Sequence, residues 1–298
     1  MLDLQQLKCF VVLAEQLHFG RAAACLNISQ PPLSLKIRAL EKKLGLQLFL
    51  RSSRHVELTH AGEILLHEAR RLLRDAEQLA KLATSLQLGE AGTLAIGYNG
   101  VMSYRLMPNL VSAFGARFPR VKLTLHEMVT AEQIKALQEH RLDVGLLRPP
   151  LPAGFRTLPL GDEDMLVFLP ANHPLAAQDA IEMEALANEP MMMFSKLEAA
   201  YLHHLVMDMC AEAGFKPILA QETRHIHAIV ALVGTGMGIA LLPASATYIH
   251  MNGVEIRPIK STHARSAPRK AEFTLAVLED NTNPVARHFM QIARNVLL

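Results

Sequence analysis

Cysteine is scarce in this 298-residue chain. Its three cysteines, Cys9, Cys25 and Cys210, are odd in number and unevenly spaced, and no CxxC motif occurs. This pattern excludes a disulfide framework and a cysteine-based zinc site, and it is typical of a reduced, intracellular protein. The histidine pairs at His203–His204 and His225–His227 lack ligand partners at metal-site spacing. We therefore expect neither a metal nor a cofactor.

Long apolar runs, a leader and enzyme motifs are also missing. No stretch approaches the roughly 18 uninterrupted apolar residues of a membrane span, and the first residues lack the features of a signal peptide. There is no GxSxG, P-loop or HExxH motif, and the GTGMG of Gly234–Gly238 is typical of a helix C-terminal turn. These absences predict a cytoplasmic protein without enzymatic activity. They argue against two alternatives, a secreted solute-binding protein and an α/β enzyme.

Charge of one sign is not in excess overall, but it is unevenly distributed. The chain has 30 Lys plus Arg against 28 Asp plus Glu. Residues 1–88 carry 12 basic and 8 acidic side chains, a net charge of +4, which leaves −2 for the remainder. A solvated basic face would give the same pattern, so charge alone does not establish nucleic-acid binding. Because half of the residues are hydrophobic, the chain can bury two domain cores.

The first 58 residues predict a winged helix-turn-helix. Apolar residues recur at helical spacing over Leu4–Leu17, a short helix is expected in RAAACLN, and a third helix begins near Ser29. Two short alternating runs in LQLFLRSSRHVELT then predict a hairpin. Helix, helix, turn, helix and hairpin is the order of a winged DNA-binding module.

The third helix, SQPPLSLKIRALEKKLG over Ser29–Gly45, begins with two prolines. If Ser29 is the N-cap, the prolines occupy the first turn, where a backbone N–H has no helical acceptor. A spacing of 100° per residue then buries one stripe, consisting of Leu33, Ile37, Leu40 and Leu44. The opposite face carries Pro31, Ser34, Leu35, Arg38 and Lys42. A rigid first turn with short polar and basic side chains suits a major-groove recognition helix.

The segment LQQLKCFVVLAEQLHFGRAAACLNISQPPLSLKIRALEKKLGLQLFLRSSRHVELTHAGEILL closely resembles the amino-terminal module of LysR-type transcriptional regulators. The rest of the chain resembles, more loosely, the effector domain of that family. The subgroup with a similar LHFGRAAA.LNISQPPLS pattern includes regulators of aromatic-compound catabolism and nucleoside-responsive regulators. The resemblance therefore implies an activator or repressor that binds promoter DNA, a small-molecule effector and RNA polymerase.

Specific DNA contacts are implied by the matching motif positions. Ala22–Asn27 would be the positioning helix and Ser29–Leu44 the helix in the major groove. The residues at or near DNA would be Ser29, Gln30, Pro31, Ser34, Leu35, Lys36 and Arg38, with Arg54 of the wing at the minor groove or the DNA backbone. Many members have Arg or Gln where this chain has Leu35. That side chain could contact a thymine methyl group or simply remain exposed to solvent.

A long helix is expected over Thr59–Leu88, with Thr59 as its cap. Its apolar residues alternate by 4 and 3: Leu65, Ala69, Leu72, Ala76, Leu79, Ala83 and Leu86. This heptad seam predicts pairing with a second copy of the helix, and the alternative is packing on the chain's own second domain. We favour a homodimer, and the resemblance extends this to a homotetramer. A hinge is expected at residues 89–92.

Strand and helix patterns alternate from residue 93 onward. The predicted fold is an α/β effector domain of two Rossmann-like lobes with parallel sheets, similar to a periplasmic binding protein. Lobe I would comprise about 93–160 and 268–298, and lobe II about 161–267.

Ligands of such domains bind between the lobes, where strands end and helices begin. In lobe I, IGYNGVMS and EMVTAEQ are two junctions of this kind. Every polar candidate could also be an ordinary cap or surface group. We predict an effector site, for an aromatic or aliphatic carboxylate, formed by Asn99, Gly100, Val101, Ser103, Thr130, Arg148, Ser195, Lys196 and Thr223, with Asn99, Thr130 and Ser195 as the principal contacts.

Overall fold

The computed structural model describes residues 2–51, 55–104, 106–260 and 269–296. The chain divides into two compact units, residues 1–85 and 86–298, and each has its own buried core.

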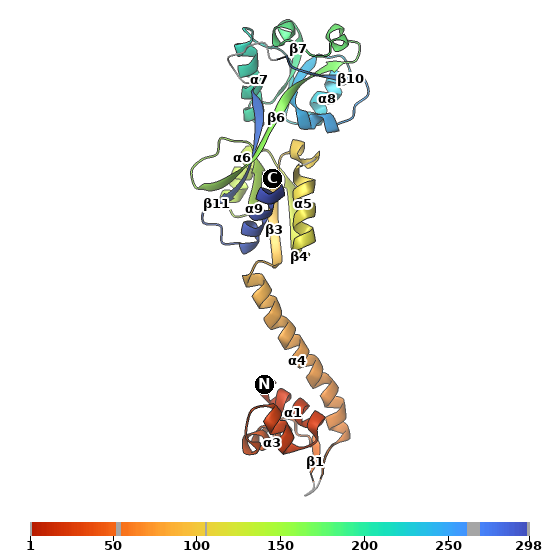
Figure 1. Ribbon diagram of the computed structural model, residues 1–298, viewed down its shortest axis with the longest axis vertical. Helices are drawn as coiled ribbons and strands as arrows, with labels where there is room; N and C mark the ends of the chain where they lie inside the picture. The colour runs from red at the N-terminus through yellow and green to blue at the C-terminus, as the bar shows by residue number, and fades with distance from the viewer. Residues whose placement is uncertain (1, 52–54, 105, 261–268, 297–298) are drawn as a thin grey trace. The chain divides into compact units, whose positions relative to one another are not determined.

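The first unit is a winged helix-turn-helix followed by a long helix (Figure 1). Its elements are α1 (Leu4–Gln16), α2 (Phe19–Cys25), α3 (Gln30–Leu44), β1 (Phe49–Arg51), β2 (Val56–Leu58) and α4 (His60–Gln87). β1 and β2 form the predicted antiparallel hairpin. The rings of Phe10 and Phe49 meet edge to face, with centroids 5.6 Å apart, so the helices and the hairpin share one core.

The start of α3 agrees with the predicted position but differs in its capping. Ser29 is the N-cap residue and the two prolines stand in the first turn, yet the Ser29 side chain makes no capping hydrogen bond. Its hydroxyl therefore remains on the surface. Leu33, Ile37 and Leu40 are fully buried, as the 100° spacing predicts. The helix ends at Gly45, whose φ of 66° is a left-handed conformation that glycine adopts without strain.

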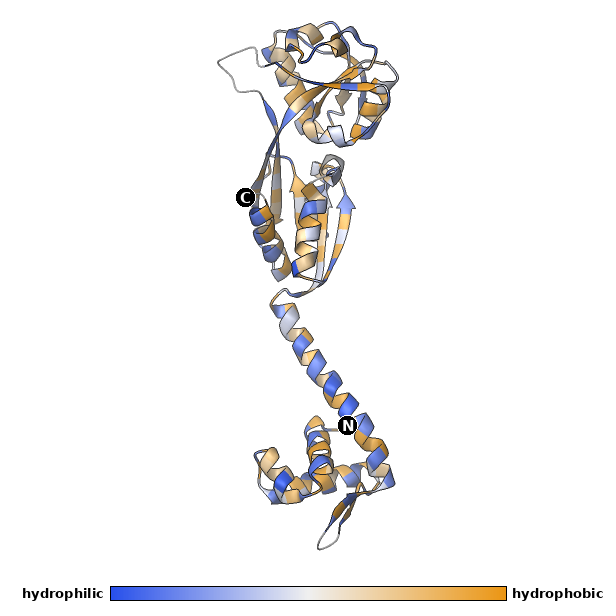
Figure 2. Ribbon diagram, turned by 45° about the vertical axis from the view of Figure 1, so that its right-hand side comes forward, coloured by the Kyte–Doolittle hydropathy of each residue, from blue (hydrophilic) through white to orange (hydrophobic). Residues whose placement is uncertain are grey.

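The helix α4 begins at a well-formed cap and then leaves the core. Thr59 Oγ1 accepts from the Gly62 N–H at 2.9 Å and donates to the Gln47 carbonyl at 2.7 Å. Ala69 is buried against the first unit, whereas Leu72 and Leu79 are 43% and 68% exposed. The seam therefore splits into a packed beginning and an exposed remainder. Figure 2 shows how apolar residues recur between polar ones along α4.

The second unit contains nine further helices or 3-10 turns and nine strands among its described residues. They are β3 (Ala91–Tyr98), η1 (Gly100–Tyr104), α5 (Leu106–Arg117), β4 (Arg120–Glu127), α6 (Thr130–Gln138), β5 (Val144–Leu147), β6 (Phe155–Pro170), η2 (Pro174–Ala177), η3 (Met183–Leu186), β7 (Pro190–Phe194), α7 (Ala200–Glu212), β8 (Ile218–Thr223), α8 (Ile226–Gly234), β9 (Ile239–Pro243), η4 (Ala244–Tyr248), β10 (Val254–Pro258), β11 (Lys270–Leu278) and α9 (Pro284–Val296). Ala91 and Gly92, which were expected in the hinge, already belong to β3 because they pair with β4.

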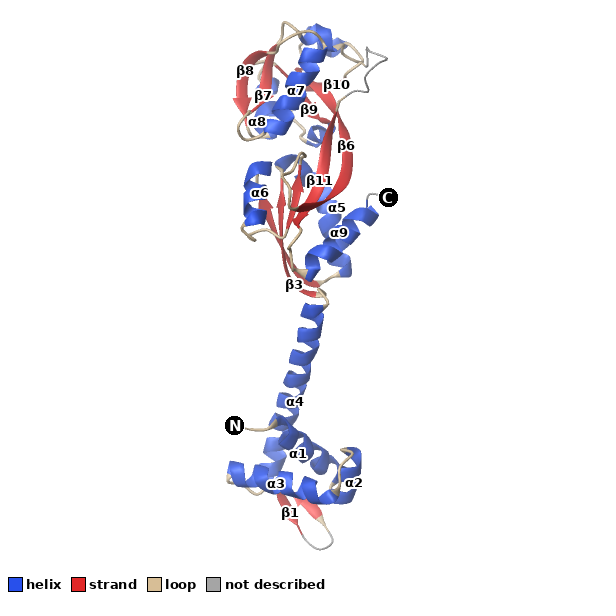
Figure 3. Cartoon of the chain, turned by 90° about the vertical axis from the view of Figure 1, so that its left-hand side faces the viewer, coloured by secondary structure: helices blue, strands red, loops and turns tan. Residues whose placement is uncertain are grey.

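The sheet of this unit is mixed, not parallel throughout. The strand order is β4-β3-β5-β11-β6-β9-β7-β8, with β10 also on β6. The parallel pairs are β3 with β4 and β5, and β7 with β8 and β9. The long strands β6 and β11 run antiparallel to each other and connect the lobes (Figure 3). The expectation of parallel sheets was wrong for these strands, because the sequence pattern of a strand does not specify the direction in which it pairs with a distant one.

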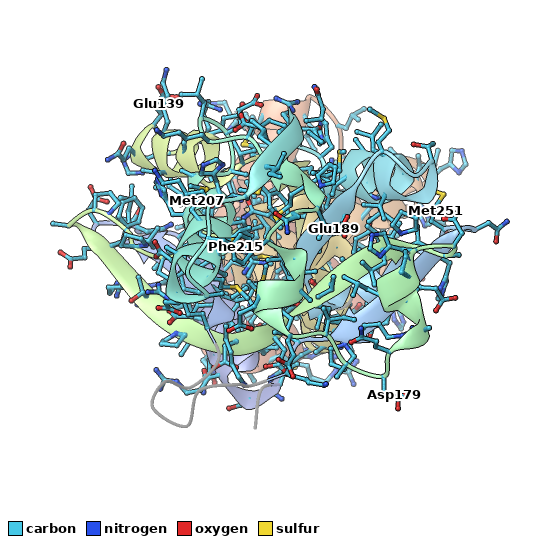
Figure 4. The ribbon with its side chains drawn as sticks, turned by 90° about the horizontal axis from the view of Figure 1, so that it is seen from above. Glu139, Asp179, Glu189, Met207, Phe215 and Met251 are labelled. Atoms are coloured by element: carbon cyan, nitrogen blue, oxygen red, sulfur yellow. The ribbon has the colours of Figure 1, made fainter. Side chains whose placement is uncertain are left out.

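Each lobe has its own core. In lobe I the ring of Phe114 on α5 meets that of Phe289 on α9 at 5.3 Å. The helix α9 was not predicted, although its buried residues Val285, Ala286, Phe289 and Ala293 follow a helical period. In lobe II the strand β7 is buried along Met191–Phe194, and Met207 and Phe215 pack beside the same core (Figure 4).

Candidate nucleic-acid interface and ligand cavity

The outward face of α3 presents the predicted side chains to solvent. Gln30, Pro31, Leu35 and Arg38 are exposed, and Ser34 is half-buried. Leu35 is 66% exposed and so contributes nothing to the core. An apolar side chain kept in water at the centre of this face is available for contact with a partner.

Lys36 differs from its neighbours on α3. Its Nζ donates to Gln5 Oε1 of α1 at 2.7 Å, and the residue is half-buried. The side chain therefore links α3 to α1 at the edge of the outward face. Arg54, predicted in the wing, lies outside the described residues.

Glu41 is a residue that the sequence reasoning missed. Its carboxylate accepts from the Leu48 and Phe49 N–H groups at 3.0 and 3.3 Å, and it pairs with Arg51 at 2.5 Å. It thereby ties the last turn of α3 to β1. The only sequence signal is an acidic residue among basic ones. The consequence is a fixed angle between α3 and the hairpin.

A cavity of about 1050 Å³ opens in the second unit, at the ends of strands from both lobes. Four junctions line it: β3 to η1, β4 to α6, β7 to α7 and β8 to α8. The first turns of α6, α7 and α8 face it, and none of these helices has a side-chain cap. Their free N–H groups and dipoles favour a negatively charged or hydrogen-bond-accepting group.

Asn99 and Thr130 lie together on the lobe I side of the cavity. The Asn99 Nδ2 donates to Thr130 Oγ1 at 3.3 Å, and Asn99 Oδ1 accepts from Gln133 Nε2 at 2.8 Å. Gln133 is fully buried and also donates to the carbonyls of Met128 and Leu146. This network orients Thr130 at the first turn of α6. Gly100 lines the cavity beside it.

Arg148 lines the cavity, but its donors are already engaged. The guanidinium is 3% exposed, pairs with Glu163 at 3.0 Å and donates to the Glu272 carbonyl at 3.0 Å. It also lies over the Phe273 ring at 4.4 Å. Burial lowers the pKa of this guanidinium, and Glu163 opposes that shift. In this arrangement Arg148 supports the cavity wall.

The other predicted residues do not line the cavity. Ser103 donates to the Gly100 carbonyl, and Ser195 and Thr223 accept from backbone N–H groups in their own turns. Lys196 is exposed. The chain places their neighbours at the cavity instead, namely Leu197–Leu202 and Arg224–His227. The side chain of Val101 lies outside the described part of the structure.

Glu127 and His227 also line the cavity and were not predicted. Glu127 is the last residue of β4 and stands three residues before α6. His227 Nε2 is hydrogen-bonded to the Tyr104 hydroxyl, so it connects α8 of lobe II to η1 of lobe I. Position at a strand-to-helix junction was the available signal for both. Among the described residues, no group of three or more His, Cys, Asp or Glu could hold a metal ion.

No helix in the described parts of the chain combines the length and the apolar character needed to cross a bilayer.

Comparisons with known proteins identify both units. Residues 4–63 match the model of the bacterial regulatory helix-turn-helix protein, lysR family, and residues 87–298 match the LysR substrate binding domain. The chain is 35% identical to the HTH-type transcriptional regulator AlsR of Bacillus subtilis (strain 168), over 98% of this chain and 95% of that protein. It is 36% identical to a probable hydrogen peroxide-inducible genes activator of Streptomyces viridosporus, over 83% of this chain and 79% of that protein.

A solved structure shares the whole architecture. Full-length CbnR, in a complex with its target DNA, has a TM-score of 0.85 and 26% sequence identity, and the match covers 100% of both chains. The matched family models account for nearly the entire chain, and the fold agrees with both of them. The chain belongs to the LysR family of bacterial helix-turn-helix transcriptional regulators.

Proposed function

We propose that this regulator binds a promoter through α3 and changes its DNA contacts when a small molecule enters the cavity of the second unit. The observation that carries the proposal is the cavity itself, with the uncapped first turns of α6, α7 and α8 facing it. Ligand binding that favours one arrangement of the lobes shifts the population of regulator states. Because its target is promoter DNA, we infer that it acts in the cytoplasm.

The DNA-binding residues of the proposal are Ser29, Gln30, Pro31, Ser34, Leu35, Lys36, Arg38 and Arg54. The exposed face of α3 and the basic charge of residues 1–88 support the described members of this set. Arg38 is the most direct candidate for a DNA contact, because it is exposed and has no ion pair within the described chain.

Fluorescence anisotropy with promoter DNA at several salt concentrations tests this assignment. Affinity should fall by about 0.9 log units per log unit of salt for each phosphate contacted, and Arg38→Ala should reduce the slope by about one phosphate if its contact is to the DNA backbone. Lys81→Ala, an exposed lysine on α4, is the matched control and should leave the slope unchanged. Affinity that depends on neither salt nor DNA sequence would contradict the proposal.

Homodimerisation through α4, and assembly of dimers into a tetramer, are also part of the proposal. The exposed Leu72, Leu79 and Leu86 support a helix-to-helix seam. The edge strands β4 and β8 expose Leu125, Ile218 and Leu219, which supports a further contact between second units. Contact of the DNA-bound assembly with RNA polymerase completes the proposal.

A small organic acid is the effector class that the helix N-termini support, and aromatic or aliphatic carboxylates are the first candidates. A thermal-shift screen of the full chain tests the site. A stabilising acid should lose its effect in Thr130→Ala and Asn99→Ala but keep it in Ser103→Ala, whose hydroxyl bonds only to its own turn. An unchanged shift in all three variants would place the effector elsewhere.

Peroxide sensing is the alternative suggested by the name of one relative. It requires a reactive cysteine, and the second unit has only Cys210. Burial raises the pKa of this thiol to about 11, so almost none is in the nucleophilic thiolate form at neutral pH. This environment favours a bound effector over cysteine oxidation.

A further inference from the structure

The cationic side chains around the cavity are already neutralised. Each Arg or Lys lining it in the described chain is paired with a carboxylate: Arg148 with Glu163 at 3.0 Å, Arg224 with Glu198 at 3.2 Å, Arg269 with Asp208 at 2.8 Å and Lys270 with Asp162 at 3.1 Å. A ligand carboxylate therefore meets no uncommitted cation among these residues. The remaining donors include backbone N–H groups and the Thr130 hydroxyl.

Glu127 has the opposite character. It lines the cavity, and within the described part of the chain its carboxylate has no hydrogen bond or ion pair. The carboxylate lies against the backbone of the β3 to η1 junction, since a Cβ added to Gly100 would stand 2.7 Å from Glu127 Oε1. Because Gly100 has no side chain, the Glu127 carboxylate can occupy this position at the lobe I end of the cavity.

The position of Glu127 restricts what can fill this end of the cavity. It stands three residues before Thr130, so an acidic side chain and the free N–H groups of α6 lie next to each other along the chain. Glu127 is exposed at the cavity, so a ligand that places only a carboxylate at α6 would bring two negative charges together. This repulsion is unfavourable, and a neighbouring ammonium group on the ligand would reverse it.

We propose that the effector is dipolar, an α-amino acid or a close analogue, with its ammonium group on Glu127 and its carboxylate on the first turn of α6. Adjacent ammonium and carboxylate groups are the defining feature of that class and match the adjacent acceptor and donors. Thr130 Oγ1 accepts from Asn99, which leaves the Thr130 proton free for the carboxylate. The inference rests on the proposed ligand switch and specifies its effector.

The remaining lining of the cavity defines the ligand side chain. Apolar residues from both lobes contribute to the wall, namely Met128, Ile134, Leu202, Leu205 and Ile226. An apolar amino acid would bury its side chain against them. Amino acids with aliphatic or aromatic side chains are therefore the preferred members of the class.

The test uses the full chain, thermal shift and calorimetric titration with a matched set of probes. The set consists of the apolar amino acids, and for each one the acid without the amine and the amine without the acid; for L-phenylalanine these are 3-phenylpropanoate and 2-phenylethylamine. At least one amino acid should bind, and loss of its amine should weaken binding by roughly tenfold to a hundredfold, the range for a hydrogen bond to a charged group.

Two variants locate the ammonium group. Glu127→Gln should reduce the preference for the amino acid over its desamino acid to about twofold or less, while Glu132→Gln, a second cavity carboxylate on the first turn of α6, should preserve it. Melting of each variant without a ligand checks that the fold is intact. Equal binding of acid and amino acid by the wild type, no binding by any apolar amino acid, or an unchanged preference in Glu127→Gln would overturn the inference.

Failure of this inference and failure of the proposed function give different results. The same preparation is tested for salt-dependent, sequence-specific promoter binding. If the chain binds its promoter specifically but binds a simple carboxylate more tightly than the amino acid, the proposed function is supported and the dipolar effector is contradicted. If specific DNA binding is itself missing, the proposed function fails.

Discussion

Glu163 makes contacts with residues of both lobes. Its Oε1 pairs with Arg148 at the end of β5, and its Oε2 accepts from the Ser245 N–H of η4 at 2.7 Å. The carboxylate is 11% exposed and the guanidinium 3% exposed. A buried pair of this kind adds little net stability over an apolar pair, but removal of one partner leaves a charge without compensation.

Replacing Glu163 by Ala should therefore destabilise the second unit by about 3 kcal/mol. Chemical denaturation measures the free energy of unfolding. Glu182→Ala is the control, since Glu182 pairs with Lys260 at 3.6 Å on the surface and its loss should cost less than about 1 kcal/mol. Equal costs for the two substitutions would show that the Arg148–Glu163 pair is effectively solvated.

The three cysteines should differ sharply in reactivity. Cys25 is exposed, whereas Cys9 and Cys210 are buried and burial raises the pKa of both thiols. Because only the thiolate reacts, iodoacetamide at pH 8 should modify Cys25 first in the native protein, as followed by mass spectrometry. Modification of all three in guanidinium chloride is the control. Rapid native labelling of Cys210 would contradict its burial and would revive peroxide sensing.

At the scale of elements, α4 shows how far a periodic pattern can be interpreted. The heptad spacing predicted one apolar seam, and the structure assigns its beginning to the core of the first unit and exposes its leucines further along. The two alternatives drawn from the sequence, pairing with a second copy of the helix or packing on the chain's own second domain, concern the same stripe of residues. A periodicity specifies which face is apolar, but the partner of that face depends on what lies next to it.

Charge placed on the exposed part of the seam should weaken the proposed dimer. Leu79→Glu would put two carboxylates opposite each other at a paired interface and remove apolar contact, so the dimer dissociation constant should rise at least tenfold. Analytical ultracentrifugation measures it. Gln78→Glu adds the same charge at the preceding position, which lies outside the seam, and should have little effect on the dissociation constant. A dimer insensitive to Leu79→Glu would have to be held by another surface.

At the scale of the whole molecule, the two units have separate cores and should unfold separately. Leu40 is fully buried in the first unit and Leu275 in the second. Calorimetry of the full chain should give two transitions, and Leu40→Ala and Leu275→Ala should each destabilise one of them by roughly 2 to 5 kcal/mol. A single transition lowered by both substitutions would mean that the units unfold as one.

The sequence alone determined the local elements and the family. The recognition helix, its buried stripe, the hairpin and most strands of the second unit follow from periodicity, prolines and caps, because the information lies within a few residues. The motif of residues 4–66 was enough to identify the class of regulator. Asn99, Gly100, Thr130 and Arg148 line the cavity, since strand-to-helix junctions gather at one edge of a sheet, and their contact with an effector stays a prediction.

Only the tertiary structure decided how these elements meet. In the folded chain, β6 and β11 pair antiparallel and connect the lobes. Ser195, Lys196 and Thr223 do not line the cavity. Arg148 donates at 3.0 Å to a carbonyl 124 residues away in the chain. The fold also leaves Glu127 unpaired, among the described residues, beside the donors of α6. Local patterns specify which face of an element is buried. The partner of a charged group depends on strand pairing between distant segments, and that pairing settles which charges around the cavity are left for a ligand.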